Sequence, residues 1–195
     1  MALSTIETLR AKIRALVNDL VKTEPETFTY TNSAIFTLAE DNIESIVQVT
    51  KNGVALGTGE YSFDSSTNEI TITPDTGNEL VNGDVIIVKY TYYKYSTTEL
   101  DDWIKASLVW LSVFNASEND FEIENGDIYP TPNNRTLDLI VLVASILMKP
   151  DWTEYRLPTL TVRYSNRISN EDKIEKLINR FRMGLGVTSV LEWDD

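Results

Sequence analysis

The hydrophobic positions change their period twice along the chain, which predicts three segments. Between Thr5 and Val21, apolar residues recur at steps of three and four, as they do on one face of an amphipathic helix. Ser4 stands before this segment and Glu7 three residues later, which is the pattern of a helix-capping box. We expect the helix to end near Pro25, because proline disfavours helical geometry in the residue before it.

The second segment, residues 26–95, alternates in the way that β-strands do. The run Ile43–Lys51 is rich in β-branched residues, and Asn52-Gly53 after it is a strong signal for a tight turn. The longest strand is expected over Val85–Tyr95, where Tyr90 and Tyr92 share one face and either pack against neighbouring strands or bind a partner. Further strands are expected at Phe28–Tyr30, Ile35–Leu38, Val54–Leu56, Tyr61–Phe63 and Glu69–Thr73.

The third segment returns to helical spacing, with helices expected over Glu99–Ala116, over Arg135–Met148 and from Ser169 to Gly184. The middle one is apolar nearly all round, so it needs cover on most sides. Trp110 lies off the apolar stripe of its helix and is predicted to face a neighbouring subunit or another partner. The inward positions of the last helix are expected to be Ile174, Leu177, Ile178 and Phe181.

Two stretches between these helices do not show helical spacing. Residues 115–134 form an acidic loop that ends in Tyr129, a second candidate for subunit or partner contact. A calcium site counted from Asp120 would need glycine at its sixth position, but Asn125 stands there, and a solvated loop is the favoured interpretation. Residues 151–168 are expected to be irregular or extended.

These patterns predict an α+β protein in which a small helical bundle is interrupted by an inserted antiparallel β-sandwich or barrel. The helical domain would comprise residues 1–24 and 97–184, and the β domain residues 25–96. Residues 185–195 would form a carboxyl-terminal docking tail beyond Gly184. Its apolar strip, Val187, Val190, Leu191 and Trp193, either docks on a partner or packs on the chain's own core.

Composition narrows the function classes. The chain has 195 residues, a formal net charge of −13, and neither histidine nor cysteine. Thiol and histidine catalysis, disulfides and Cys/His zinc sites are therefore excluded. We expect that the protein is not an enzyme and that it has neither a cofactor nor a metal site. Specific DNA binding needs a basic face, which the acidic excess between residues 23 and 151 disfavours, although an acidic surface suits solubility or the wall of a DNA channel.

The sequence gives no indication of a membrane protein or of export. The longest apolar stretch, Leu137–Met148, is shorter than the roughly 20 residues that cross a bilayer. The first residues lack the basic and apolar runs of a signal peptide, so synthesis in a cytoplasm is expected.

The helical part resembles the head–tail connector proteins of tailed bacteriophages, also called adaptor or head-completion proteins. The resemblance lies in the opening helix Thr5–Val21, the helix start Thr98–Ser107, the later apolar helix, and a last helix that bears arginine and continues into a tail. The β segment is similar to small β modules of phage virion proteins.

The resemblance implies a structural protein at the head–tail junction of a virion. It implies a homo-oligomeric ring, a dodecamer, beneath the portal, with tail or head-closure proteins as further partners and DNA only as passing cargo. The carboxyl-terminal segment of that family docks on the portal. In this chain, the candidate portal-binding residues are Phe181, Leu185, Val187, Val190, Leu191 and Trp193.

Three alternatives remain open at this stage. The chain is another structural piece of a phage, such as a capsid decoration or baseplate component, or an intracellular carbohydrate- or peptide-binding module built on the β segment. The third alternative is an enzyme with carboxylate chemistry, against which the absence of histidine and cysteine weighs.

Overall fold

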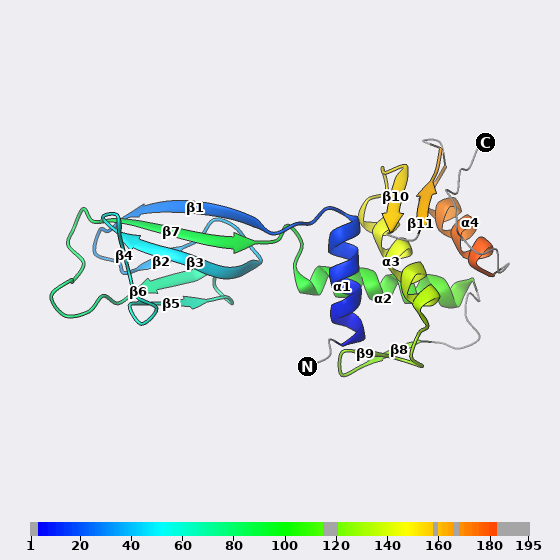
Figure 1. Ribbon diagram of the computed structural model, residues 1–195, viewed down its shortest axis with the longest axis horizontal. Helices are drawn as coiled ribbons and strands as arrows, with labels where there is room; N and C mark the ends of the chain where they lie inside the picture. The colour runs from blue at the N-terminus through cyan, green and yellow to red at the C-terminus, as the bar shows by residue number, and fades with distance from the viewer. Residues whose placement is uncertain (1–3, 115–120, 158–159, 166–167, 183–195) are drawn as a thin grey trace. The chain divides into compact units, whose positions relative to one another are not determined.

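The computed structural model describes residues 4–114, 121–157, 160–165 and 168–182. These residues form an α+β protein, as predicted, with four helices and eleven strands whose pairings are all antiparallel (Figure 1). The described strands close no barrel. Residues Leu20–Ser96 make one compact unit, here called the β unit, and the described residues before and after it make a second one, the helical unit.

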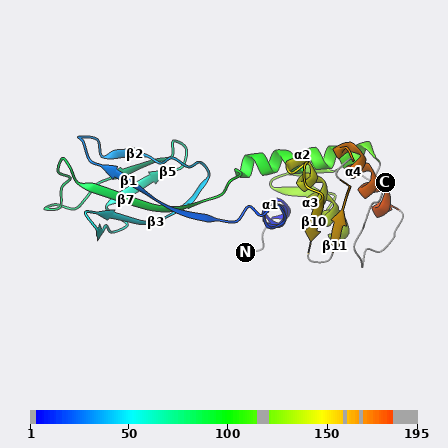
Figure 2. The same ribbon diagram turned by 90° about the horizontal axis from the view of Figure 1, so that it is seen from above.

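The β unit contains two sheets. The four-stranded sheet has the order β1-β7-β3-β4 and the three-stranded sheet the order β2-β6-β5, and the two lie in separate layers (Figure 2). A strand lies at or overlaps each predicted position, and the predicted Asn52-Gly53 turn joins β3 to β4 with positive φ at both residues. Two predicted bounds are wrong: β1 begins at Lys22, before the expected Phe28, and β7 ends at Tyr92, so that β3 and not β7 is the longest strand. The strands are β1 (Lys22–Thr29), β2 (Ile35–Thr37), β3 (Ile43–Lys51), β4 (Val54–Ala55), β5 (Tyr61–Asp64), β6 (Glu69–Ile72) and β7 (Val85–Tyr92).

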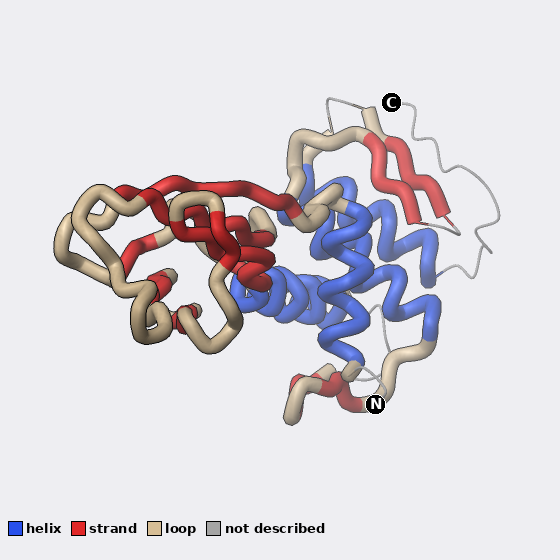
Figure 3. Tube along the Cα trace, turned by 60° about the vertical axis from the view of Figure 1, so that its left-hand side comes forward, coloured by secondary structure: helices blue, strands red, loops and turns tan. Residues whose placement is uncertain are grey.

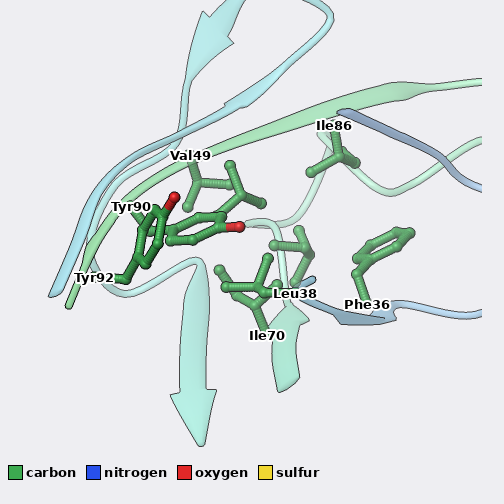
Figure 4. Packing of buried hydrophobic residues seen from close by; sticks show 9 residues of the cluster. Phe36, Leu38, Val49, Ile70, Ile86, Tyr90 and Tyr92 are labelled. Carbon is green, nitrogen blue, oxygen red and sulfur yellow. The ribbon is translucent and has the colours of Figure 1, made fainter. Parts of the chain in front are cut away.

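A single apolar core lies between the two sheets (Figure 4). Strand β7 alternates between buried and more exposed residues, and its buried face contains Tyr90 and Tyr92. Of the two interpretations of this tyrosine pair, packing inside the sheet is therefore the one that holds. The remaining members of the core are Phe36, Leu38, Val49, Ile70, Ile72, Ile86 and Val88.

The first and last strands of the β unit are neighbours. β1 pairs with β7 along its whole length, from Lys22 opposite Tyr92 to Thr29 opposite Val85. The chain therefore enters and leaves the β unit on adjacent strands. Pro25 lies inside β1, where a helix end was expected, and an edge strand accepts proline because one side of it makes no ladder hydrogen bonds.

The opening helix ends earlier than its periodicity suggested. α1 spans Thr5–Leu16, and the predicted capping box of Ser4 and Glu7 is present. The helix stops because Asn18 adopts a left-handed conformation, with φ of 56°, and the amide of Asp19 donates to the carbonyl of Arg14 at 2.8 Å. The prediction that the helix reaches Val21 is therefore wrong.

The core of the helical unit surrounds α3 (Asn134–Met148). This helix contacts α1, α2 (Thr97–Val113) and α4 (Asn170–Arg182), and Leu139–Ile146 are buried on every side, as the apolar sequence predicted. Two ion pairs connect α1 to its neighbours: Arg10 contacts Asp101 of α2, and Lys12 contacts Asp138 of α3 at 2.9 Å.

Two hairpins lie between the helices: one forms where an acidic loop was expected, and the other where residues 151–168 were expected to be irregular or extended. β8 (Glu122–Glu124) and β9 (Asp127–Tyr129) are joined by Asn125-Gly126, both with positive φ, as a tight hairpin turn requires. This hairpin binds the start of α1, where the backbone amide of Thr5 donates to the Asp127 carboxylate at 2.8 Å. β10 (Glu154–Leu157) and β11 (Leu160–Arg163) form the second hairpin, which lies beside the helices (Figure 3).

Candidate partner-binding surfaces

Two exposed valines form an apolar strip on α2, in the described part of the helical unit. Val109 and Val113 lie one helical turn apart, and their exposed fractions are 62% and 66%. Both fall outside the buried stripe of this helix, which consists of Leu100, Ile104, Ser107, Leu108 and Leu111. We call Val109 and Val113 the α2 strip.

The α2 strip borders a groove of about 390 Å³ between α2 and the β8–β9 hairpin. Phe121 and the partly exposed Ile123 supply apolar surface from the hairpin side. Lys105 and Ser112 are the polar members of the lining, and Lys105 also contacts Asp102. The groove and the strip together form a mostly apolar surface, and apolar surfaces of this kind occur where proteins contact other proteins.

Trp110 lies next to the α2 strip in sequence but is half-buried. Its ring stacks on that of Phe114, with centroids 5.6 Å apart and planes at 10°. The residue is thus held by its own helix, and the neighbouring valines offer more exposed surface than the tryptophan does. Tyr129, the other contact residue predicted from the sequence, lies half exposed at the end of β9 and opposite Glu122.

Phe181 is the one predicted portal-binding residue among the described positions. It lies near the end of α4, where Arg135 of α3 donates a hydrogen bond to its carbonyl and places the guanidinium 5.4 Å from its ring centroid. Its ring is half-buried and contributes to packing between α3 and α4. The other predicted portal-binding residues, Leu185, Val187, Val190, Leu191 and Trp193, lie outside the described residues.

Many carboxylates of the β unit organise loops. Asp84 accepts hydrogen bonds from the amide of Val81 at 2.8 Å and from the Asn52 side chain at 2.7 Å, and these bonds lower its pKa. Glu60 accepts from the amides of Gly57 and Asp75, which likewise lowers its pKa. Some of the acidic residues in excess therefore stabilise turns by accepting hydrogen bonds from backbone amides.

Lys173 is a buried cation that the sequence pattern did not single out. Only 4% of the residue is exposed, and its ammonium donates to the carbonyls of Pro150 at 2.6 Å and Trp152 at 3.2 Å. Burial lowers the pKa of this lysine. Through these hydrogen bonds, Lys173 connects α4 to the segment that follows α3. In the sequence it is one of several charged residues near a helix start, so nothing there marked it as buried.

Within the described part of the chain, no three acidic side chains lie where they could hold a metal ion together. The described helices include none with the length and hydropathy needed to cross a bilayer. No protein-family model matches the chain, and no curated protein is similar to it in sequence.

Proposed function

We propose that this chain is a structural virion protein of a tailed bacteriophage, a head-to-tail adaptor. It forms a homo-oligomeric ring under the portal, extends the DNA channel and provides the platform to which the tail attaches. Its helical part is one domain, interrupted by a β-sandwich module. It works by fitting between neighbouring proteins, without a cofactor and without a catalytic step, and DNA passes it only as cargo.

The α2 strip is the observation that carries this proposal. Two valines that are 62% and 66% exposed, one turn apart and beside an apolar groove, form a surface that gains stability when a neighbour covers it. In a ring, each subunit offers two different faces to its two neighbours, so one such strip per subunit is repeated at every contact. Trp110 lies between the two valines in sequence, and the same neighbour would cover its exposed part.

The chain path through the two units supports the inserted arrangement. Arg10 and Asp101 join α1 to α2 although the β unit separates them in sequence. The β unit begins and ends on the paired strands β1 and β7, with Lys22 opposite Tyr92. An insert whose two ends are adjacent can be added between two helices without separating them.

Localisation in the particle tests the proposal directly. Virions purified from the strain that encodes the chain should contain it in a constant copy number, as measured by quantitative mass spectrometry. Cryo-electron microscopy of particles that carry a tagged copy should place it at the single vertex where the tail attaches. Absence from the particle, or an even distribution over the capsid as for a decoration protein, would end the proposal.

A pair of matched variants tests the α2 strip. Val113→Glu introduces a charge into the proposed contact, whereas Val54→Glu introduces the same charge at a comparably exposed valine of the β unit. With the portal protein present, we expect Val113→Glu to reduce ring assembly at least tenfold by mass photometry, and Val54→Glu to leave it unchanged. Circular dichroism should show both variants folded. Equal assembly by the two variants would remove the strip from the contact.

A deletion tests the tail. Removal of Leu185–Asp195 should abolish binding of the chain to the portal protein in a pull-down or by mass photometry, while the far-ultraviolet circular dichroism of the rest is retained. Unchanged portal binding would exclude the tail as the docking segment.

A further inference from the structure

The helical unit contains a second cleft, separate from the groove beside the α2 strip. It has a volume of about 690 Å³ and lies between α1, α3 and β10. Ala15, Leu16 and Leu157 supply its apolar surface, and its charged groups are Lys12, Asp138 and Arg156. We call it the α1–β10 cleft.

The charges at this cleft favour an anionic occupant, which is unusual in a chain with a net charge of −13. Lys12 is paired with Asp138, and Arg156 is paired with Glu154, a carboxylate that also serves Arg163. The Arg156 side chain is 70% exposed and can turn toward a second carboxylate. Among the residues that line this cleft, two are cationic, Lys12 and Arg156, and one is anionic, Asp138.

The cleft lies close to the point where the last helix ends. Arg135 contacts Phe181 near the end of α4, and its sequence neighbour Asn134 lines the cleft. Residues 183–195 follow α4, and at roughly 3.3 Å per residue this segment can extend about 40 Å. A folded unit of roughly 100 residues has a radius of gyration of about 13 Å, so a segment with this reach can enter the cleft of its own subunit.

The chemistry of residues 183–195 matches the cleft. The segment contains Leu185, Val187, Val190, Leu191 and Trp193 as apolar residues. Three of its last four residues, Glu192, Asp194 and Asp195, are acidic, and none of residues 183–195 is basic. Apolar side chains can fill the space along Leu16 and Leu157, while the carboxylates lie near Lys12 and Arg156.

We propose that residues 183–195 bind in the α1–β10 cleft of their own subunit. Attachment through α4 makes this binding intramolecular, so that a weak affinity is sufficient for high occupancy. The inference does not depend on the proposed virion role. If both hold, the cleft and the portal compete for one segment, and the portal releases the tail when it binds.

Engineered disulfides in the full chain test the proposal, because the natural sequence has no cysteine. Ala15→Cys places a thiol at an exposed position of the cleft, and Val190→Cys places one in the tail. The control pair combines Val190→Cys with Glu175→Cys, which is exposed on α4 and also within reach of the tail. Under mild oxidation we expect the intrachain disulfide of the cleft pair to form at least fivefold faster than that of the control pair.

Charge reversal tests the role of the rim. Arg156→Glu should slow disulfide formation by the cleft pair severalfold, whereas Lys105→Glu, which reverses an exposed lysine of α2 that does not line the cleft, should change it little. Hydrogen–deuterium exchange of the cysteine-free full chain gives a second readout. Amides of residues 183–195 should be protected in the natural chain and lose that protection in Arg156→Glu.

Three outcomes would overturn the inference. The first is equal disulfide rates for the two cysteine pairs, and the second is a tail without protection in the natural chain. The third is a predominance of interchain disulfides at low protein concentration, which would assign the cleft to the tail of a second copy. The virion proposal is judged separately, since absence from particles would leave the disulfide rates unchanged.

Discussion

Arg10 of α1 and Asp101 of α2 form a two-point ion pair, with Nε–Oδ1 and Nη2–Oδ2 distances of 2.7 and 2.6 Å. The two side chains are 27% and 25% exposed, so water screens the pair only in part. The hydrogen bonds to Asp101 raise the pKa of Arg10 further above its ordinary value. The pair connects the segment before the β unit to the segment after it, and it makes the two halves of the helical unit depend on each other.

A double-mutant cycle should give this pair a coupling free energy of about 1 kcal/mol. The variants are Arg10→Met, Asp101→Asn and their combination, each measured by urea unfolding. Tryptophan fluorescence follows the helical unit, because all four tryptophans lie outside residues 20–96. The matched control is the pair Asp102–Lys105 on α2, whose side chains are 67% and 61% exposed. Its coupling should stay below about 0.5 kcal/mol, and equal coupling in both cycles would contradict the assigned role.

Most strands of the β unit could be predicted from the sequence, but the first part of β1, residues 22–27, was not. Ile43–Lys51 and Asn52-Gly53 are predicted at the positions where β3 and its turn lie, because β-branched residues and turn residues are local signals. The end of α1 could not be read in the same way. Leu20 continues the apolar spacing of the helix, yet it is exposed, because the left-handed conformation of Asn18 ends the helix first.

The β8–β9 hairpin was not predicted, although its turn dipeptide is present in the sequence. Asn125-Gly126 is the same turn dipeptide as Asn52-Gly53, but the acidic residues around it favoured the interpretation as a solvated loop. The hairpin is stabilised by a long-range contact, that of Asp127 with the start of α1, which no local pattern reveals. Of the candidate contact residues, Tyr129 is exposed, whereas Trp110 is stacked on Phe114 and the more exposed surface belongs to Val109 and Val113.

Lys173 should contribute to stability through its hydrogen bonds to two backbone carbonyls. Lys173→Ala removes the donor to Pro150 and Trp152, and we expect a loss of about 1 to 3 kcal/mol in the free energy of unfolding of the helical unit. Urea unfolding followed by tryptophan fluorescence measures it. The control Lys105→Ala removes an exposed lysine from a helix and should change stability by less than about 0.5 kcal/mol. A loss no greater than that of the control would show that water replaces the lysine at these carbonyls.

We expect the β unit to lose stability at alkaline pH, because the pKa of Tyr90 is raised in the folded protein. Burial, and then the nearby Glu26 carboxylate, raise the pKa of Tyr90 from its ordinary value near 10 to about 12. Since the folded pKa is above the unfolded one, the stabilisation is complete below pH 10 and is lost as the pH rises toward 12. The loss over that window should reach about 2 to 3 kcal/mol for a shift of this size.

The measurement for Tyr90 is urea unfolding at pH 9 and pH 11.5, monitored by far-ultraviolet circular dichroism. Tyr90→Phe cannot ionise at this position, so the gap in stability between the natural chain and the variant should shrink or reverse at the higher pH. At pH 9 the variant is expected to be less stable than the natural chain, because it lacks the hydrogen bond of 3.2 Å that the Tyr90 hydroxyl donates to the Glu26 carboxylate. An identical gap at both pH values would show that the folded protein tolerates the ionised tyrosine.

The β unit should fold when it is produced alone as residues 20–96. It has its own apolar core from both sheets, and its first and last strands are paired along their length, so neither end is left without a partner strand. We expect dispersed amide resonances in a two-dimensional NMR spectrum and a cooperative urea transition. Ile70→Ala, at a fully buried position, should lower the unfolding free energy by about 2 to 4 kcal/mol, and Val54→Ala, at an exposed position, by less than about 0.5 kcal/mol. A collapsed spectrum or equal effects of the two substitutions would mean that the sheets need the helical unit in order to pack.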